Sequence, residues 1–428
     1  MDKIKLAAIS DSVLLTSGFA NVARPIIYGF HEAGYEVYSF GTMDTSYDFG
    51  KKLPFMYQPA NPYDEMGHRT VALFLTNVQP DIIFILFDPG NLDTFVSIIL
   101  ALQESGNIKK CPIIAYTPIE GVPIPSSTAN TVAKIINNNG KVILYSPKMI
   151  ELFNKQFPGV EEHLDFAYHG LDHAPFQKYS DLKRTMLRDK VGWSDYFVVG
   201  SVGVNKRTKG FDTIIYTARM LRDLEKDEGI KFYLHTSLKP TMWGYNLKDM
   251  AINYGVDDMI IFKPEEDVEP GGNLHGTDYQ NEEEIRDGDS PLLALSFIDR
   301  LNCLDCYLDL SQVEGWGLPT HEAMRCGVPT ISLKDNSIRS EILNSGAMLL
   351  DPEPFRVWTT WHTGVKLVLV DPYVAAQAIL EMKNASDTIK NFWSKAALNN
   401  ANQFDWQPTK DKFVRLVKEM VDEYDYNL

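Results

Sequence analysis

Two glutamates separated by seven residues are the most chemically suggestive feature of this sequence of 428 residues. Glu314 and Glu322 flank a segment that contains two glycines, Gly315 and Gly317. A glycine turn leaves backbone amides bare, so that they can bind phosphate oxygens, and carboxylates accept hydrogen bonds from hydroxyl groups. Two carboxylates around such a turn therefore suit a ligand that carries both a diphosphate and vicinal hydroxyls.

The flanking residues predict the elements that place this turn. The apolar run Cys306–Leu310 predicts a short buried strand, and Pro319 and Gly327 suit the first turn and the end of a helix. In that order, a strand, a turn and a helix direct the anion-binding amino end of the helix above the strand. A second interpretation of Glu322 stays open, because the helix dipole favours any carboxylate in a first turn by about 0.3–1 kcal/mol.

The stretch Glu314–Pro329 (E-G-W-G-L-P-T-H-E-A-M-R-C-G-V-P) resembles the E-x7-E motif of retaining, nucleotide-sugar-dependent glycosyltransferases of family 4. The resemblance implies that Glu322 binds the ribose hydroxyls of the donor. It also implies that Glu314 acts in catalysis and in donor binding. The backbone amides expected to face the transferred sugar and the diphosphate are those of Gly315, Trp316, Gly317 and Leu318. Trp316 stands where the family often has Phe.

A basic turn earlier in the chain resembles a second motif of this family. Lys209–Asp212 fits the end of G-R-x-x-x-x-K-G-x-D, in which the Arg and the Lys neutralise the donor diphosphate. The usual place of the Arg holds Val204 or Gly203, and Arg207 is the expected substitute. The resemblance implies that Lys209 and Arg207 bind the donor and act in catalysis. A solvated surface turn is the alternative interpretation of the same residues.

Two loops in the first half are further candidates. Ser17-Gly18-Phe19 follows the first predicted strand, at the edge where open parallel sheets bind ligands. The family has a glycine loop there, so we expect Ser17, Gly18 and Phe19 to contact the donor, although a helix cap at Ser17 explains the sequence equally well. Glu120 lies where many relatives carry an active-site His, and it is the candidate catalytic residue of that loop. A loop glutamate pointing into water is the alternative.

Short apolar runs alternate with longer amphipathic stretches, which predicts parallel sheets with crossover helices. Strands are predicted at Lys5–Ser10, Glu36–Phe40, Asp81–Phe87, Pro112–Tyr116, Lys141–Tyr145 and Leu164–Tyr168, and then at Tyr196–Ser201, Lys231–Thr236, Met259–Phe262, Thr330–Leu333 and Ala347–Leu350. Helices are predicted, among other places, at Phe211–Arg222, Asn246–Tyr254 and Leu292–Leu301.

The segment Ala167–Phe176 resembles the linker that opens the second domain of the family. We therefore expect an α/β protein of the GT-B fold, with two Rossmann-like parallel-sheet domains facing a central cleft. Residues 1–170 would form the acceptor domain and residues 171–404 the nucleotide-sugar donor domain. The C-terminal helix, within residues 405–428, would cross back and pack on the first domain.

Composition argues against several classes of partner. The net charge of −16 argues against general affinity for nucleic acid or anionic lipid, although the acidic insertion predicted at residues 263–290 carries much of this excess. Four cysteines, no apolar run of membrane-spanning length and no signal peptide favour a cytoplasmic protein. No metal is expected, because Cys303 and Cys306 lack a second close pair and Asp287-x-Asp289 lacks a preceding strand.

The resemblance to family 4 implies a metal-independent, retaining glycosyltransferase that requires no cofactor and uses a nucleoside-diphosphate sugar, with UDP- or GDP-sugars as the expected donors. The acceptor stays open between a saccharide, a small molecule and a modified nucleic acid such as DNA with hydroxymethylated bases. A non-catalytic protein that only binds nucleotide sugars is the other alternative, because the usual His near Glu120 is missing.

Overall fold

The computed structural model describes residues 3–44, 53–61, 63–225, 229–238, 244–264, 291–334, 338–353, 358–359 and 364–426. The chain forms two compact units. Unit 1 contains Met1–Gly170, Thr363–Val365 and Asp405–Leu428, and unit 2 contains Leu171–His362 and Lys366–Phe404. The acidic stretch from residue 265 to residue 290, which the sequence predicts as an insertion, lies outside the described residues.

Unit 1 is built on a parallel sheet of seven strands in the order β3-β2-β1-β4-β5-β6-β7. The strands are β1 (Lys5–Asp11), β2 (Glu36–Thr42), β3 (Met56–Pro59), β4 (Ile82–Leu86), β5 (Ile113–Tyr116), β6 (Lys141–Leu144) and β7 (Leu164–Phe166). Every residue of β4 is buried, because helices cover both faces of such a sheet. Six of these strands match the sequence prediction, and β3 was not predicted.

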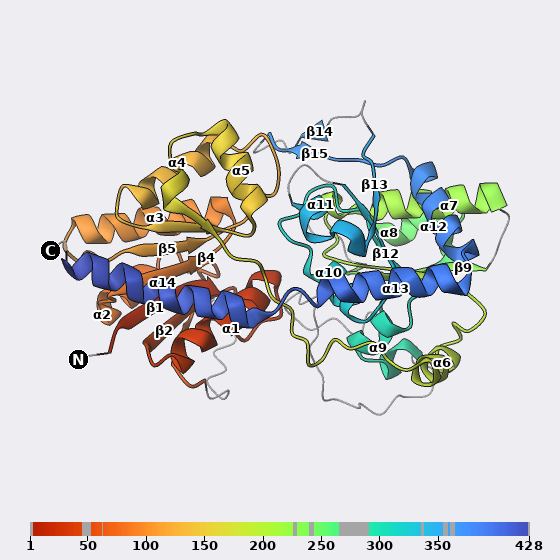
Figure 1. Ribbon diagram of the computed structural model, residues 1–428, viewed down its shortest axis with the longest axis horizontal. Coiled ribbons are helices and arrows are strands. Elements are labelled where there is room, and N and C mark those ends of the chain that lie inside the picture. Colours follow the sequence, from red (N-terminus) through yellow and green to blue (C-terminus); the bar gives the residue numbers. More distant parts are fainter. Residues whose placement is uncertain are drawn as a thin grey trace. The chain divides into compact units, whose positions relative to one another are not determined.

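Helices connect these strands, and the last helix of the chain also belongs to this unit. The helices of unit 1 are α1 (Gly18–Glu32), α2 (Val71–Val78), α3 (Pro89–Glu104), α4 (Ser126–Ile136), α5 (Pro147–Gln156) and α14 (Trp406–Tyr426). Figure 1 shows α14 lying along unit 1. Its fully buried Phe413 makes edge contacts with the rings of Phe30, Phe84 and Tyr116. Burial of this aromatic cluster explains why the end of the chain belongs to the first unit.

Unit 2 repeats the architecture with a parallel sheet of six strands in the order β10-β9-β8-β11-β12-β13. The strands are β8 (Phe197–Val202), β9 (Ile230–His235), β10 (Ile260–Phe262), β11 (Cys306–Asp309), β12 (Thr330–Leu333) and β13 (Met348–Leu350). Successive residues of β8 point to opposite faces of this sheet, so Val199 packs in the hydrophobic core on one face and Val198 in the core on the other. A short antiparallel pair, β14 (Trp358–Thr359) and β15 (Lys366–Leu367), lies outside this sheet.

Helices cover both faces of the second sheet. They are α6 (Asp181–Lys190), α7 (Phe211–Glu225), α8 (Leu247–Asn253), α9 (Phe297–Asn302), α10 (Leu318–Arg325), α11 (Arg339–Ile342), α12 (Pro372–Asn384) and α13 (Asp387–Ala401). The helix predicted over Leu292–Leu301 is wrong in its extent. A short 3-10 helix occupies Pro291–Ala294, and Ser296 then starts α9 through a capping box with Asp299.

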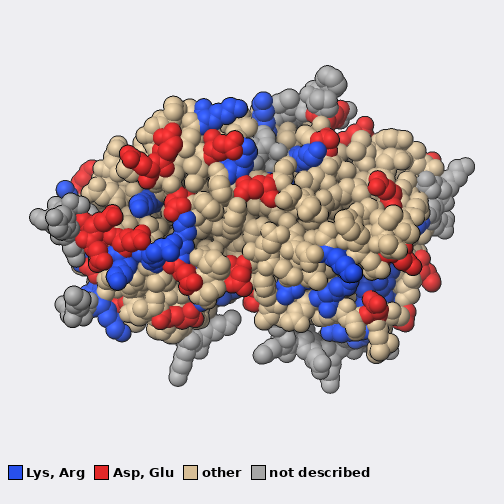
Figure 2. All heavy atoms as spheres, in the orientation of Figure 1, with Lys and Arg blue, Asp and Glu red and all other residues tan. Residues whose placement is uncertain are grey.

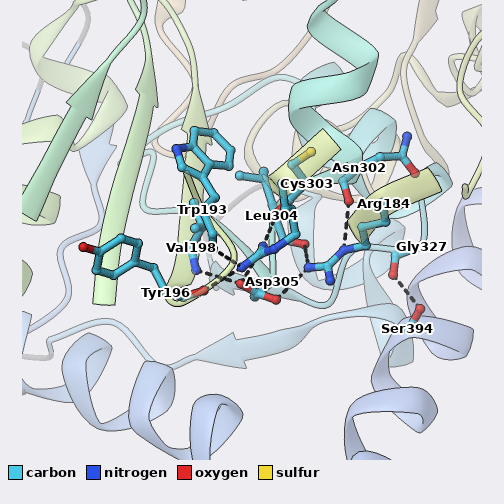
Figure 3. A network of polar contacts seen from close by, with 11 residues as sticks. Arg184, Trp193, Tyr196, Val198, Asn302, Cys303, Leu304, Asp305, Gly327 and Ser394 are labelled. Carbon is cyan, nitrogen blue, oxygen red and sulfur yellow. Dashed lines mark hydrogen bonds and ion pairs between the residues drawn. The ribbon is translucent and has the colours of Figure 1, made fainter. Parts of the chain in front are cut away.

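A network of arginines anchors the start of unit 2 to its sheet (Figure 3). Asp305, which directly precedes β11, pairs with Arg184 at 2.6 Å and with the buried Arg188 at 2.9 Å. Arg188 also donates to the carbonyl oxygens of Trp193 and Tyr196, at 2.7 and 2.6 Å. The network lies at the amino ends of the strands, and it therefore stabilises the unit at the edge opposite to the carboxyl ends of the strands.

On the face shown in Figure 2, basic and acidic side chains are interspersed, and basic side chains gather on unit 2 between α13 and α6. Basic side chains thus gather locally on this face, although the net charge of the whole chain is −16. Among the described residues, no helix combines the length and the apolar character that crossing a bilayer requires.

Replacing Arg188 with Ala should lower the free energy of unfolding by about 3–5 kcal/mol, because Asp305 would keep only the more exposed Arg184 and two carbonyl oxygens would lose their buried donor. The matched control is Arg219→Ala, which removes a half-exposed pair with Asp223 and should cost about 0.5 kcal/mol or less. Urea denaturation followed by fluorescence measures both. Equal, small losses for the two variants would contradict the anchoring role of this network.

Candidate functional site

The two motif loops of unit 2 lie at the carboxyl ends of neighbouring strands. The strand order reverses at β8, which pairs with β9 on one side and with β11 on the other. The basic turn, a 3-10 helix at Arg207–Lys209, follows β8, and the glycine turn that begins with Glu314 follows β11. Ligands of open α/β sheets bind at such a switch point, beyond the carboxyl ends of the strands.

Backbone contacts hold these two loops against each other. Gly210 has a φ of +70°, and a Cβ at this position would lie 2.3 Å from the carbonyl oxygen of Leu310. The amide of Gln312 donates to the carbonyl oxygen of Thr208 at 2.7 Å. Only glycine permits this approach, since any side chain at residue 210 would collide with backbone. Packing thus explains the glycine of the K-G sequence.

This packing brings Lys209 and Glu314 together. The Lys209 ammonium donates to a carboxylate oxygen of Glu314, and the two form an ion pair. Their side chains are 24% and 19% exposed, so the pair is partly shielded from water but still accessible. A cation and a carboxylate are therefore presented side by side at the switch point of the sheet.

The glycine turn leads directly into α10. Gly317 precedes the helix with a φ of +88°, a conformation that favours glycine. Glu322 lies in the second turn of the helix and is buried, at 6% exposed. Within the described residues its Oε2 has no hydrogen-bond partner. Burial raises the pKa of Glu322 to about 8. A buried carboxyl oxygen without a partner is costly, which points to a ligand that supplies the missing hydrogen bond.

Trp316 is buried under the turn rather than exposed on it. Its ring stacks on His321 at 5.3 Å and meets the edge of Phe404 at 5.2 Å. Burial lowers the pKa of His321 to about 4, so this imidazole is neutral at physiological pH. The indole therefore supports the turn from below, and a donor contact from Trp316 would come from its backbone.

Arg207 lies on the outer side of the same site. The residue is exposed, and its guanidinium carbon lies 5.7 Å from the centre of the Tyr245 ring. This distance is within the range of a cation–π contact. The structure thus places both predicted cations, Lys209 and Arg207, on one turn.

The remaining predicted residues belong to unit 1. Ser17 caps α1 by accepting from the amide of Ala20 at 3.1 Å, and its hydroxyl donates to Asp11. Gly18 is exposed, with no atom near the position of a Cβ, and Phe19 meets the edge of Phe87 at 6.2 Å. The cap that the sequence allowed is present, and the donor contacts of this loop stay a prediction.

Glu120 is exposed beyond the carboxyl end of β5. Buried aromatic and histidine side chains lie beside the same strand: Tyr116 bonds Nδ1 of His169 at 2.7 Å, and Tyr145 contacts the His169 ring at 4.0 Å. The catalytic role of Glu120 stays a prediction. Among the described residues, no three His, Cys, Asp or Glu side chains gather into a group that could hold a metal ion.

Sequence reasoning missed two residues beneath the glycine turn. Asp309, the last residue of β11, and Arg339, the first of α11, are both buried. An acid inside the apolar run Cys306–Leu310 is a signal that could have identified Asp309, because an acid is seldom buried without a partner. No local pattern marks Arg339.

Comparison with known structures fixes the architecture. No protein-family model matches the chain, and no curated protein matches it in sequence. HepE of Anabaena in complex with UDP aligns with 99% of this chain and 100% of its own, at a TM-score of 0.62 and 15% identity. Sucrose-phosphate synthase of Thermosynechococcus elongatus aligns with 98% and 100%, at a TM-score of 0.67 and 14% identity. WaaG, a glycosyltransferase of lipopolysaccharide biosynthesis, aligns with 96% and 99%, at 0.63 and 12%.

The chain has the GT-B fold. The similarity covers nearly the whole chain, so both sheets share the architecture of these proteins. The predicted α/β fold class is thereby confirmed. The superpositions, with TM-scores of 0.62–0.67, establish the GT-B fold, and identities of only 12–15% leave activity to the residues of this chain.

The buried Glu322 makes stability depend on pH. Because its pKa in the folded protein is about 8, the folded state binds a proton that the unfolded state loses near pH 4.5. The cost of this burial is therefore absent below the unfolded pKa and grows as the pH rises to about 8. Glu322→Gln should gain a few kcal/mol of stability relative to the native protein between pH 5 and pH 8.

Urea denaturation of the two proteins across this range measures the difference. The control is Glu381→Gln, which changes an exposed carboxylate of α12 in the same unit. A difference between Glu322→Gln and the native protein that stays constant with pH would contradict the buried state of Glu322.

Proposed function

We propose that this protein is a retaining glycosyltransferase that moves a sugar from a nucleoside-diphosphate sugar to an acceptor hydroxyl without a metal ion. The observation that carries the proposal is the Lys209–Glu314 pair beside the start of α10, together with the buried Glu322 of the same helix, whose Oε2 has no hydrogen-bond partner among the described residues. The structural neighbours support it, since they include the glycosyltransferase WaaG and HepE with bound UDP or UDP-glucose.

The donor would bind by replacing contacts that the protein makes with itself. Its diphosphate would take Lys209 from Glu314, with Arg207 and the amides of Gly315–Leu318 as further donors. The released Glu314 would then accept from a hydroxyl of the transferred sugar, and Glu322 would accept from the ribose. Because Glu322 is buried and neutral near pH 7, its carboxyl can also donate a hydrogen bond.

The reaction would break the bond between the anomeric carbon and a diphosphate oxygen, and the electron pair would remain on the diphosphate. The acceptor oxygen would attack the same face of the sugar and pass its proton to the departing diphosphate oxygen. Lys209, Arg207 and the helix start would stabilise the charge that develops on the leaving group. One preorganised donor of this kind contributes about 3–4 kcal/mol at the barrier, and fixed cations would fill the role that a metal plays elsewhere.

Lys209→Ala should lower kcat about 100-fold or more, because the leaving diphosphate would lose its nearest cation. The free energy of unfolding should change little, since the Lys209 side chain is partly exposed. The control Lys248→Ala removes an exposed lysine of α8 in the same unit and should leave turnover unchanged. Near-normal turnover of Lys209→Ala in a folded protein would remove the phosphate assignment.

A thermal-shift screen with UDP-, GDP- and ADP-sugars would identify the nucleotide and the sugar of the donor. A ligand at 100 times its dissociation constant should stabilise the protein by about 2.7 kcal/mol. Transfer assays with saccharides, small molecules and hydroxymethylated duplex DNA then identify the acceptor. Stabilisation without any transfer or donor hydrolysis would favour the non-catalytic alternative, and no stabilisation by any nucleotide sugar would contradict the proposal.

A further inference from the structure

A buried ion pair lies directly beneath the glycine turn. Asp309 ends β11, and Arg339 begins α11, thirty residues later in the chain. Oδ2 of Asp309 lies 3.8 Å from Nε of Arg339, and the two side chains are 8% and 2% exposed. Burying two charges costs more than their attraction returns unless further hydrogen bonds satisfy both groups.

Those hydrogen bonds go to the two ends of the glycine turn. Asp309 accepts from the amide of Ser311 at 3.0 Å and from the hydroxyl of Thr320 at 3.0 Å. Arg339 donates through Nη1 to the carbonyl oxygens of Ser311 and Leu333, at 2.9 and 3.0 Å. Ser311 precedes the turn and Thr320 follows it, so one ion pair fixes both ends of the segment that contains Glu314.

The ion pair also determines the charge state of Asp309, which lies under the start of α10. Burial by itself would raise the pKa of Asp309, but Arg339 and the hydrogen bonds from Ser311 hold it below its ordinary value. Asp309 is thus a carboxylate whose charge is balanced from below by Arg339. The balance matters because an unneutralised carboxylate at this place would repel an anion bound at the amino end of α10.

We propose that Asp309, Arg339 and Thr320 are positioning residues that hold the glycine turn in the geometry that binds the donor diphosphate. This inference rests on the proposed function, and it assigns a role to three side chains that do not touch the donor. Thr320 transmits the position of the ion pair to the helix start, because its hydroxyl is the contact between Asp309 and α10.

Changes of Asp309 or Arg339 would leave a buried charge unpaired and could prevent folding. The decisive variant is therefore Thr320→Val, which removes the hydroxyl and keeps the shape. Thr320→Ser keeps the hydroxyl and serves as the rescue. The matched control is Thr217→Val in α7, which removes another buried hydroxyl that donates to the carbonyl oxygen of Thr213 at 2.8 Å.

The measurements are the dissociation constant of UDP by calorimetry, the donor KM and kcat, and the midpoint of thermal unfolding. Thr320→Val should weaken UDP binding and raise the donor KM about tenfold, because the internal hydrogen bond that favours the binding geometry of the turn is lost. Thr320→Ser should restore both within about threefold. The midpoint of unfolding should fall no more for Thr320→Val than for Thr217→Val, whose binding of UDP should match that of the native protein.

Two different results would contradict the positioning role of Thr320. UDP binding by Thr320→Val equal to that of the native protein would overturn the positioning role and leave the proposed function standing. Failure of the native protein to bind any nucleoside diphosphate would overturn the proposed function, and the positioning role with it.

Discussion

The site depends on one close approach, that of the Gly210 backbone to the carbonyl oxygen of Leu310. This contact lets the turn after β8 lie directly against the end of β11, and the hydrogen bond between Gln312 and Thr208 holds it there. The Lys209 side chain therefore lies close enough to Glu314 to form an ion pair. Two motifs more than a hundred residues apart become one site because a residue without a side chain stands between them.

Three further features prepare this site for an anionic ligand with hydroxyl groups. The Lys209–Glu314 pair keeps a cation accessible without leaving it unpaired, and Gly317 opens the amino end of α10. Glu322 holds a carboxyl oxygen in the interior that no described group satisfies. Each of these arrangements is costly or neutral for the protein alone, and under the proposed function each would gain when a diphosphate and a ribose bind. Such local conflicts with stability are typical of functional sites.

Much of the fold could be predicted from the sequence because parallel sheets buried on both faces leave a strong apolar pattern, as in β4. The strand β3 was missed because Met56–Pro59 lacks that pattern, and the break at Ser296 was missed because a capping box interrupts an apolar stretch. Lys209, Glu314 and Glu322 could be found through motif spacing. Arg339 could not, since its role arises only when β11 and α11 pack together.

The most direct test of the account is a crystal structure of the protein with a bound nucleoside-diphosphate sugar. We expect the Lys209 ammonium to leave Glu314 and to lie about 3 Å from a phosphate oxygen, with Glu322 hydrogen-bonded to the ribose. An intact Lys209–Glu314 pair with the nucleotide bound elsewhere would contradict it.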